Sequence, residues 1–397
     1  MSNSKDNIKK GSCPVYKKCG GCQLQNLTYE EQLKYKQNKV KRLLEKFCPV
    51  DPIIGMDNPY HYRNKVQAAF WTDKKGKIIS GVYQSGTHHI VGIDSCQTED
   101  IIADKIIVAV RKLLPSFKLT TYNEDAGKGF LRHILVKRGF STNQIMLVLV
   151  TGTPVFPSKN NFVKAILKQF PAITTIVQNI NPYRTNLVLG DNQKILYGKG
   201  YIEDILCECK FRISPKSFYQ INPVQTEILY SKAIEFANLN GNETVLDTYC
   251  GIGTIGIIAA KHGAGKVIGA ELNGDAVRDA IVNARTNNLK NIRFFKADAG
   301  EFMHNISSEN EKPDVVFMDP PRAGSDTKFL DSLIKMSPNT VVYVSCNPET
   351  LARDLEYLTK SSVFKVKKIQ PVDMFPHTAH IECVVLISDI RNKSTKR

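Results

Sequence analysis

The chain has 397 residues, of which 42% are hydrophobic and 23% charged, a composition typical of a globular protein with two or three domains. No apolar run reaches the roughly 18–20 residues of a membrane span, and the opening MSNSKDNIKKGSC lacks a signal core, so we expect a cytoplasmic protein without a membrane partner. The 54 Lys and Arg residues exceed the 38 Asp and Glu residues by 16, which favours a polyanionic partner such as nucleic acid. Charge alone leaves a basic protein with no such partner equally open.

Four of the ten cysteines form a candidate metal or cluster site near the N-terminus. Cys13, Cys19 and Cys22 lie in CPVYKKCGGCQ with the spacing C-x5-C-x2-C, and Cys96 in IDSCQTED supplies a fourth thiol. A cytoplasmic chain of this size is not expected to carry a disulfide framework, so this clustering favours a metal centre over scattered core thiols. The spacing fits both zinc and an iron–sulfur cluster, since four thiolates bind either one.

Residues 28–47, TYEEQLKYKQNKVKRLLEKF, are predicted to form a helix. Thr28 and Glu31 have the spacing of a capping box, and apolar residues follow at helical intervals. The many lysines of this helix fit a solvated face better than RNA contact.

The pattern from about residue 60 to 213 changes to short strands, interrupted by helices near 100–114 and 160–169, and predicts an α+β domain. The predicted strands are VQAAFWT, IISGVYQ, HILVKRG, QIMLVLVTG, TTIVQNI, KILYGKGYIED and FRIS. One of them brings together Arg132, His133, Lys137 and Arg138, which would either lie against phosphates or form a solvated sheet face.

From residue 244 onward the chain alternates strand and helix, which predicts a parallel sheet flanked by helices. The predicted strands are TVLDTY, KVIGAEL, RFFKADA, DVVFMDPP and TVVYVSC, with helices from about 254, at 275–288 and at 349–360, and final strands near 364–370 and 381–388. Ligands of such sheets bind beyond the carboxyl ends of the strands, so the residues at these ends are the candidate site.

The first strand ends at Asp247 in DTYCGIGTIG, where Gly251 and Gly253 permit a tight turn close to a ligand. After the second strand, Glu271 suits hydrogen bonding to ribose hydroxyls, although a surface carboxylate explains it equally well. Asp298 follows the third strand and is placed to meet an adenine edge.

The fourth strand ends in Asp319-Pro320-Pro321-Arg322, where the prolines stiffen the chain and hold the carboxylate in place. No phosphate-binding loop of the G-x-x-x-x-G-K-[ST] type occurs, which disfavours a nucleoside triphosphate. An acidic site without a phosphate cradle fits S-adenosylmethionine, a nucleoside with a cationic sulfur.

Cys346 in YVSCNPETLARD ends the fifth strand at the same edge. A buried core thiol is the common explanation for such a residue. At the ligand face of a basic chain, however, we expect positive surroundings to activate it as a nucleophile. Glu382 in HTAHIECVVLI enters an apolar strand, where a carboxylate is costly unless it is paired or functional. Cys346 and Glu382 are therefore our candidate nucleophile and base.

Taken together, these segments resemble the S-adenosylmethionine-dependent RNA uridine-5-methyltransferases over nearly the whole chain. The resemblance rests on the order and spacing of the cysteine cluster with Cys96, FYQIN with Gln225, DTYCGIGT, AEL, DPPR, SCNP and DMFPHTAHIE. It implies a class I (Rossmann-like) α/β methyltransferase domain beside a central α+β domain with an N-terminal iron–sulfur site. It also implies Cys346 as nucleophile and Glu382 as base, acting on carbon 5 of a uridine.

The same resemblance implies a 4Fe–4S cluster on Cys13, Cys19, Cys22 and Cys96, and S-adenosylmethionine as cofactor. The matching cofactor-binding positions are Gln220, Tyr249, Glu271 and Asp319, with Asp298 as a helper. The implied organisation is a cluster segment (1–24), a helix packed on the methyltransferase domain (25–56), a central RNA-binding domain (57–213) and the methyltransferase domain (214–397).

Two departures from the family pattern matter: the first bears on the expected substrate, and the second leaves Thr254 out of the cofactor-binding set. Only twelve residues precede Cys13, where many relatives carry an RNA-binding β-barrel of the TRAM type, and Thr254 replaces a common asparagine. The short form resembles the ribosomal RNA members, so we expect a uridine in 23S ribosomal RNA, with transfer RNA as the alternative and a monomeric enzyme.

Three rival functions fit the sequence less well. A DNA cytosine-5-methyltransferase usually carries its cysteine in a Pro-Cys loop after the fourth strand, whereas Cys346 follows the fifth. An adenine N-methyltransferase would have an aromatic residue where Arg322 stands. A non-catalytic cluster-bearing RNA-binding or redox-sensing protein would not need both Cys346 and Glu382.

Overall fold

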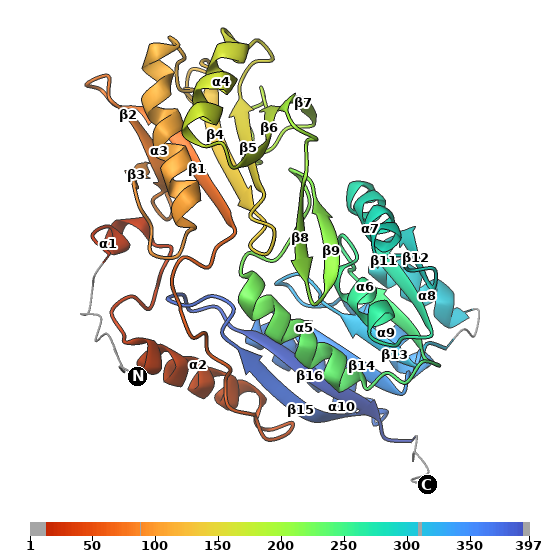
Figure 1. The fold of residues 1–397 in the computed structure, drawn as a ribbon. Coiled ribbons are helices and arrows are strands. Elements are labelled where there is room, and N and C mark those ends of the chain that lie inside the picture. The colour runs from red at the N-terminus through yellow and green to blue at the C-terminus, as the bar shows by residue number, and fades with distance from the viewer. Residues whose placement is uncertain (1–12, 88, 309–311, 392–397) are drawn as a thin grey trace, which may run out of the picture.

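The computed structural model describes residues 13–87, 89–308 and 312–391. The described chain forms two seven-stranded sheets and one separate two-stranded ribbon. Figure 1 shows the first sheet at the top of the molecule, the ribbon β8–β9 below it, and the second sheet, with its helices, at the bottom. Within the described residues, no helix is long and apolar enough to cross a membrane.

The first sheet has the strand order β3-β2-β1-β4-β5-β6-β7 and is antiparallel except between β5 and β6. The helices α3 and α4 share a hydrophobic core with β1, β4 and β5. The bounds are β1 Lys65–Thr72, β2 Ile78–Tyr83, β3 Ile90–Gly92, α3 Ile101–Ser116, β4 Leu131–Arg138, β5 Ile145–Thr151, α4 Lys159–Gln169, β6 Ile173–Ile180 and β7 Asn192–Tyr197.

The structure corrects the prediction of a single strand over KILYGKGYIED. Positive φ angles of 72° at Gly198 and 80° at Gly200 turn the chain here, so the segment divides between β7 and β8. The ribbon pairs β8 Ile202–Leu206 with β9 Cys209–Ile213, and β9 packs against α7.

Three of the four basic residues of β4 are buried, so neither a solvated face nor phosphate contact fits them, whereas the fourth, Arg138, is partly exposed and pairs with the Asp100 carboxylate at 2.6 Å. Arg132, His133 and Lys137 are about 95% buried. Arg132 donates to the carbonyl oxygens of Asn181 and Tyr183, and Lys137 donates to two carbonyls in the chain segment that leads to α5. Buried donors need such acceptors, and here they tie β4 to its neighbouring loops.

The second sheet has the strand order β12-β11-β10-β13-β14-β16-β15. The five strands from β12 to β14 are parallel as predicted, whereas β16 runs antiparallel to both of its neighbours. The bounds are α5 Pro223–Ala237, β10 Thr244–Thr248, α6 Thr254–Lys261, β11 Lys266–Glu271, α7 Gly274–Thr286, β12 Ile292–Lys296, α8 Ala299–Ser308, β13 Val315–Met318, α9 Thr327–Met336, β14 Thr340–Ser345, α10 Pro348–Lys360, β15 Phe364–Val372 and β16 Glu382–Asp389.

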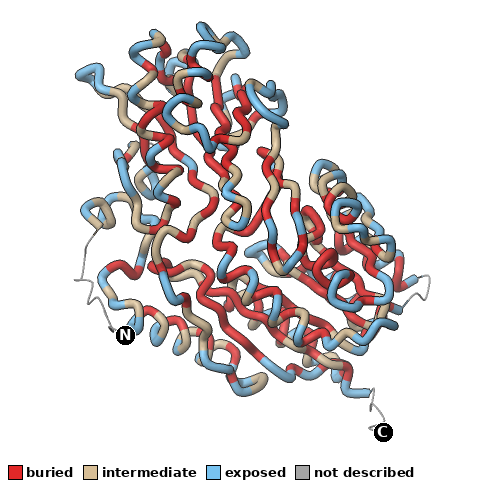
Figure 2. The backbone as a smooth tube through the Cα atoms, in the orientation of Figure 1, coloured by how far each residue is buried: buried red, intermediate tan, exposed pale blue. Residues whose placement is uncertain are grey.

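Helices cover both faces of this sheet because successive strand residues point to opposite sides. On β13, Val315 and Phe317 join the core of α5 and α6, whereas Val316 and Met318 join the core of α8, α9 and α10. Figure 2 shows the resulting buried strands between more exposed helices.

Two helices precede the first sheet, α1 Tyr16–Cys19 and α2 Tyr29–Leu44. The predicted capping box begins α2: the Thr28 hydroxyl accepts from the Glu31 amide at 3.3 Å, and the Glu31 carboxylate accepts from the Thr28 amide at 2.8 Å. Although α2 is early in the chain, it packs against α10 and β15 of the second sheet (Figure 1).

Candidate active site

A cavity of about 470 Å³ opens where β10, β11, β13 and β14 end, within the range of about 300–1,000 Å³ usual for small-molecule sites. Its position agrees with the rule that ligands bind at the carboxyl ends of parallel strands. Six of the seven residues predicted for catalysis and cofactor binding line it, namely Gln220, Tyr249, Glu271, Asp319, Cys346 and Glu382.

Cys346 and Glu382 are neighbours because β14 and β16 run in opposite directions. Ser345 is the register partner of Cys383. Cys346 directly follows Ser345 at the end of β14, and Glu382 directly precedes Cys383 at the start of β16. The thiol and the carboxyl therefore lie side by side. Both side chains line the cavity.

The surroundings of Cys346 are more acidic than the sequence suggested. Burial raises its pKa to about 11, and the carboxyls of Glu382 and Asp319 add to this rise. Arg322 acts in the opposite direction but does not outweigh them. In the protein by itself, burial and these two carboxyls therefore work against the positive activation expected from the sequence, and Arg322 works for it.

Glu382 is 3% exposed, and burial raises its pKa well above the usual value. The negative charge of Asp319 adds to the rise, and Arg322 opposes it. A buried carboxyl in a ligand cavity whose pKa is raised in this way is a candidate for a catalytic acid or base.

The cavity also contains two further buried carboxyls beneath the turn after β10. Burial raises the pKa of Asp319 to about 7 and that of Asp247 to about 8. Asp247 accepts a hydrogen bond from the Gly256 amide at 2.7 Å. The protein by itself offers little positive charge to balance these buried carboxylates. The site is therefore suited to a cationic ligand.

Glu271 is held at the mouth of the cavity by the glycine-containing turn. Its two carboxylate oxygens accept from the amides of Gly251 at 3.0 Å and Asn273 at 2.7 Å. Gly251 and Gly253 have left-handed φ angles of 56° and 81°, and a Cβ on Gly253 would come within 2.7 Å of the Phe294 ring. The tight turn at these glycines agrees with the sequence prediction, and the structure adds that the turn fixes the Glu271 carboxylate.

Tyr249 lines the cavity, whereas the structure places Asp298 outside the lining. The Tyr249 ring lies 5.5 Å from the Phe329 ring, and burial raises the pKa of its hydroxyl to about 12. Asp298 is next to the start of α8 and accepts from the Glu301 amide at 3.1 Å. Its charge still reaches Tyr249, whose pKa it raises.

Among the cavity residues that were not identified as site residues from the sequence are three with rings, Tyr230, Phe375 and His380. Tyr230 comes from α5, and Phe375 and His380 come from the loop between β15 and β16. The Phe375 and His380 rings meet edge to face at 6.1 Å. Asn222 and Pro223 have the pattern of an N-cap followed by proline at the first turn, which is the signal that would have predicted α5 and hence Tyr230.

The four cysteines near the N-terminus have the thiol donors of a cluster site, and the two segments that carry them are adjacent. Gln25, just after Cys22, donates to Gln97, just after Cys96, at 3.2 Å. Burial raises the pKa of Cys22, and the charges of Cys19 and Cys13 contribute. Among residues 13–87, 89–308 and 312–391, however, no three His, Cys, Asp or Glu side chains are arranged to hold a metal ion. The four thiols are chemically suited to a cluster, but the described structure does not gather them into a metal site.

The structure of the Pyrococcus abyssi tRNA (uracil-54, C5)-methyltransferase in complex with S-adenosyl-L-homocysteine is similar over most of the chain. Its TM-score is 0.77 at 30% sequence identity, with 92% of this chain and 85% of that chain covered. This likeness, the doubly covered sheet and the acidic strand-end cavity define a class I S-adenosylmethionine-dependent methyltransferase.

The family model described as tRNA (Uracil-5-)-methyltransferase matches residues 28–390. An uncharacterized RNA methyltransferase of Bacillus cereus is 44% identical over 387 residues, covering 96% of this chain and 84% of that protein. One of Clostridium tetani is 43% identical over 380 residues, covering 95% and 82%. The chain belongs to the tRNA (uracil-5-)-methyltransferase family, and by family it is an S-adenosylmethionine-dependent RNA (uracil-5-)-methyltransferase.

Proposed function

We propose that the protein methylates carbon 5 of a uridine in 23S ribosomal RNA through a covalent bond between Cys346 and carbon 6 of the uracil. The observation that carries the proposal is the strand register that sets Cys346 beside Glu382 in one cavity. A nucleophile and a base must both reach one flat ring, and this arrangement supplies them from two adjacent strand ends.

The proposed steps give each residue a defined task. Carbon 5 of uracil is a weak nucleophile, and the Cys346 thiolate attacks carbon 6 to make carbon 5 electron-rich. S-adenosylmethionine, when bound, would supply the methyl group to carbon 5 from its sulfonium, whose sulfur–methyl bond breaks to leave the neutral thioether S-adenosylhomocysteine. Glu382 then removes the proton from carbon 5, and the bond between carbon 6 and the Cys346 sulfur breaks to release the methylated base. The target base must leave its stack to enter the cavity.

The cofactor would be held by the acidic wall of the cavity. Glu271 would accept from the ribose hydroxyls, since its carboxylate is fixed by two backbone amides. Asp319, Gln220 and Tyr249 would contact the rest of the cofactor, and Asp298 would act from the second layer, next to Tyr249. The buried carboxyls favour the sulfonium cation over a neutral ligand.

The most specific part of the proposal is the RNA that is methylated, for which there are two candidates, 23S ribosomal RNA and transfer RNA. The resemblance to ribosomal RNA members favours 23S ribosomal RNA. Transfer RNA is the alternative, favoured by the name of the matching family and of the Pyrococcus abyssi enzyme. Incubation of the enzyme with labelled S-adenosylmethionine and unmodified transcripts of each RNA, followed by nucleoside analysis, decides between them. Labelled 5-methyluridine from transfer RNA alone would refute the ribosomal target.

Two variants test the catalytic assignments. Cys346→Ala should abolish methyl transfer and leave the dissociation constant for S-adenosylmethionine nearly unchanged. Glu382→Gln should accumulate an RNA–protein adduct that survives denaturing electrophoresis, because the base that permits its release is missing. Loss of cofactor binding in Cys346→Ala, or no adduct in Glu382→Gln, would contradict the assigned roles.

We also propose that Cys13, Cys19, Cys22 and Cys96 hold a 4Fe–4S cluster. The support is a set of four free thiols on two adjacent segments, and no catalytic step depends on it. Anaerobically purified protein should contain about four iron and four sulfide atoms per chain and absorb near 400 nm, whereas Cys22→Ser should lose both. Zinc in place of iron would refute the cluster.

A further inference from the structure

The segment 373–381, here called the 373–381 loop, leads directly into Glu382. It joins the end of β15 to the start of β16, and Val372 is the register partner of Glu382. Two of its side chains, Phe375 and His380, line the cavity. A shift at the start of this loop therefore moves the proposed base and two walls of the site together.

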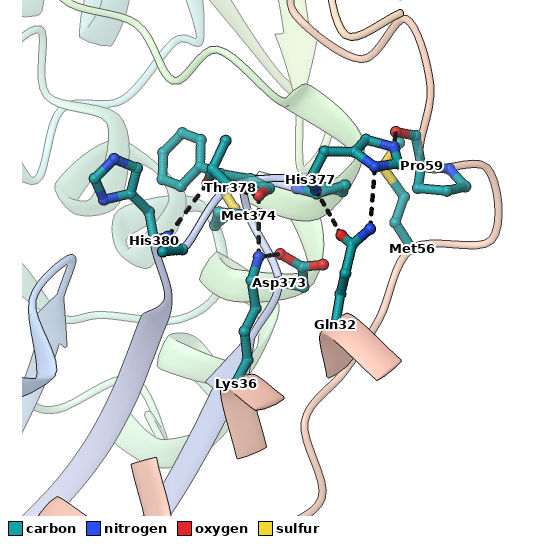
Figure 3. A network of polar contacts seen from close by, with 12 residues as sticks. Gln32, Lys36, Met56, Pro59, Asp373, Met374, His377, Thr378 and His380 are labelled. Carbon is teal, nitrogen blue, oxygen red and sulfur yellow. Dashed lines mark hydrogen bonds and ion pairs between the residues drawn. The ribbon is translucent and has the colours of Figure 1, made fainter. Parts of the chain in front are cut away.

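A lysine from the second helix of the chain reaches the start of this loop. The Lys36 Nζ lies 2.6 Å from the Asp373 Oδ1 and donates to the Phe375 carbonyl at 3.0 Å. Both charged side chains are 0% exposed. Figure 3 shows Lys36 pointing from α2 into the loop, with Gln32 beside it on the same helix face.

Further contacts from the N-terminal part of the chain hold the middle of the loop. Gln32 accepts from the His377 amide at 2.8 Å and its amide nitrogen lies 3.2 Å from the His377 ring (Figure 3). The Leu24 amide donates to the His377 carbonyl at 3.0 Å, and the Gln23 side chain accepts from the Ala379 amide at 3.2 Å. The loop thus takes its shape from residues 23–36.

We propose that Lys36 is a positioning residue for the methylation reaction. Its buried ammonium fixes the first turn of the 373–381 loop, so that Glu382 faces carbon 5 of the uracil held by Cys346. The inference rests on the proposed function, because it assigns Lys36 to the step in which Glu382 acts. Proton abstraction depends on geometry, and a misplacement of about 1 Å costs about 100-fold in rate.

A hydrophobic residue would fill the space between α2 and β15 without the cost of burying a charge. What an ammonium adds is a fixed direction, because it donates to the Asp373 carboxylate and to the Phe375 carbonyl, two positions apart in sequence. Tyr29 holds the other Asp373 oxygen at 3.0 Å, so the carboxylate has no freedom to turn.

The test compares Lys36→Met with Lys41→Met, a matched control on the same helix whose side chain is 44% exposed and pairs only weakly, with Glu45 at 4.0 Å. The substrate is whichever unmodified transcript, ribosomal or transfer RNA, accepts methyl groups from the wild type. Lys36→Met should lower kcat about 10- to 100-fold and change KM for RNA by less than about twofold. Its steady-state RNA adduct should rise above the wild-type level, towards that of Glu382→Gln.

Adduct accumulation separates positioning from loss of structure, because a poorly folded enzyme forms less adduct. If Lys36→Met unfolds, the double variant Lys36→Met/Asp373→Asn, which removes both charges, takes its place. Provided that Glu382→Gln accumulates adduct, either of two results would overturn the inference. One is an equal kcat in Lys36→Met and Lys41→Met, and the other is a loss of both adduct and turnover in Lys36→Met. If Glu382→Gln accumulates none, the assignment of the base fails first and the inference with it.

Discussion

Replacing Glu382 by glutamine should make Cys346 more acidic. Burial is the largest cause of the rise in the Cys346 pKa from 9.0 to about 11, and the charge of Glu382 is the second. The substitution removes the second cause and keeps the first. The pKa of Cys346 should therefore fall below about 11 but stay above 9.0.

The assay is the pH dependence of alkylation at Cys346, followed by mass spectrometry of the peptide that contains it, because only the thiolate reacts. Two further variants should shift the midpoint of alkylation by different amounts, which gives an internal check. Asp319→Asn should lower the midpoint less than Glu382→Gln, since Asp319 is the third cause, and Arg322→Gln should raise it. A midpoint that does not fall in Glu382→Gln would refute the side-by-side placement of the thiol and carboxyl.

Three predictions concern stability. Lys36→Met leaves the Asp373 carboxylate buried without its ammonium and should lower the free energy of unfolding by about 3–5 kcal/mol in urea titrations, with much of the loss recovered in Lys36→Met/Asp373→Asn. The Asp319 pKa of about 7 lies above its ordinary 3.8, so the folded protein holds this proton more tightly and loses stability as pH rises from about 4 to 7. Asp319→Asn should accordingly stabilise the protein at pH 8 more than at pH 4, and equal effects would contradict the raised pKa. Thr28→Ala should cost about 1 kcal/mol through loss of the capping box that it shares with Glu31, and no change would mean the helix start is already frayed.

Much of the site was predictable because parallel strands deliver their ends to a common edge. Asp247, Glu271, Asp319 and Cys346 each follow an apolar run that alternates with a helix, and this pattern alone brings them together. The glycine turn was predictable for a local reason: Gly253 has a backbone conformation and a close neighbour that other residues do not tolerate.

The rest depends on contacts between residues distant in sequence. No local pattern shows that β16 inserts antiparallel between β14 and β15, yet this sets Glu382 beside Cys346. The cationic side chains of β4 and α2 looked solvated, but Arg132 and Lys36 find buried acceptors supplied by other segments. Likewise, the pKa of Cys346 follows from burial and from carboxyls that the tertiary fold brings near it.

The ion pair between Lys36 and Asp373 also has a consequence for how the protein is made. Its two members are separated by 337 positions, so the inner face of α2 leaves the ribosome long before its partner strand does. At a synthesis rate of about 5–20 residues per second, this interval lasts about 17–70 s. During it, the apolar side of α2, with Val40 and Leu44, has no sheet to cover it. The second sheet and the proposed base can reach their final arrangement only when the last tenth of the chain has emerged, so the early helix is without its packing partner during most of translation.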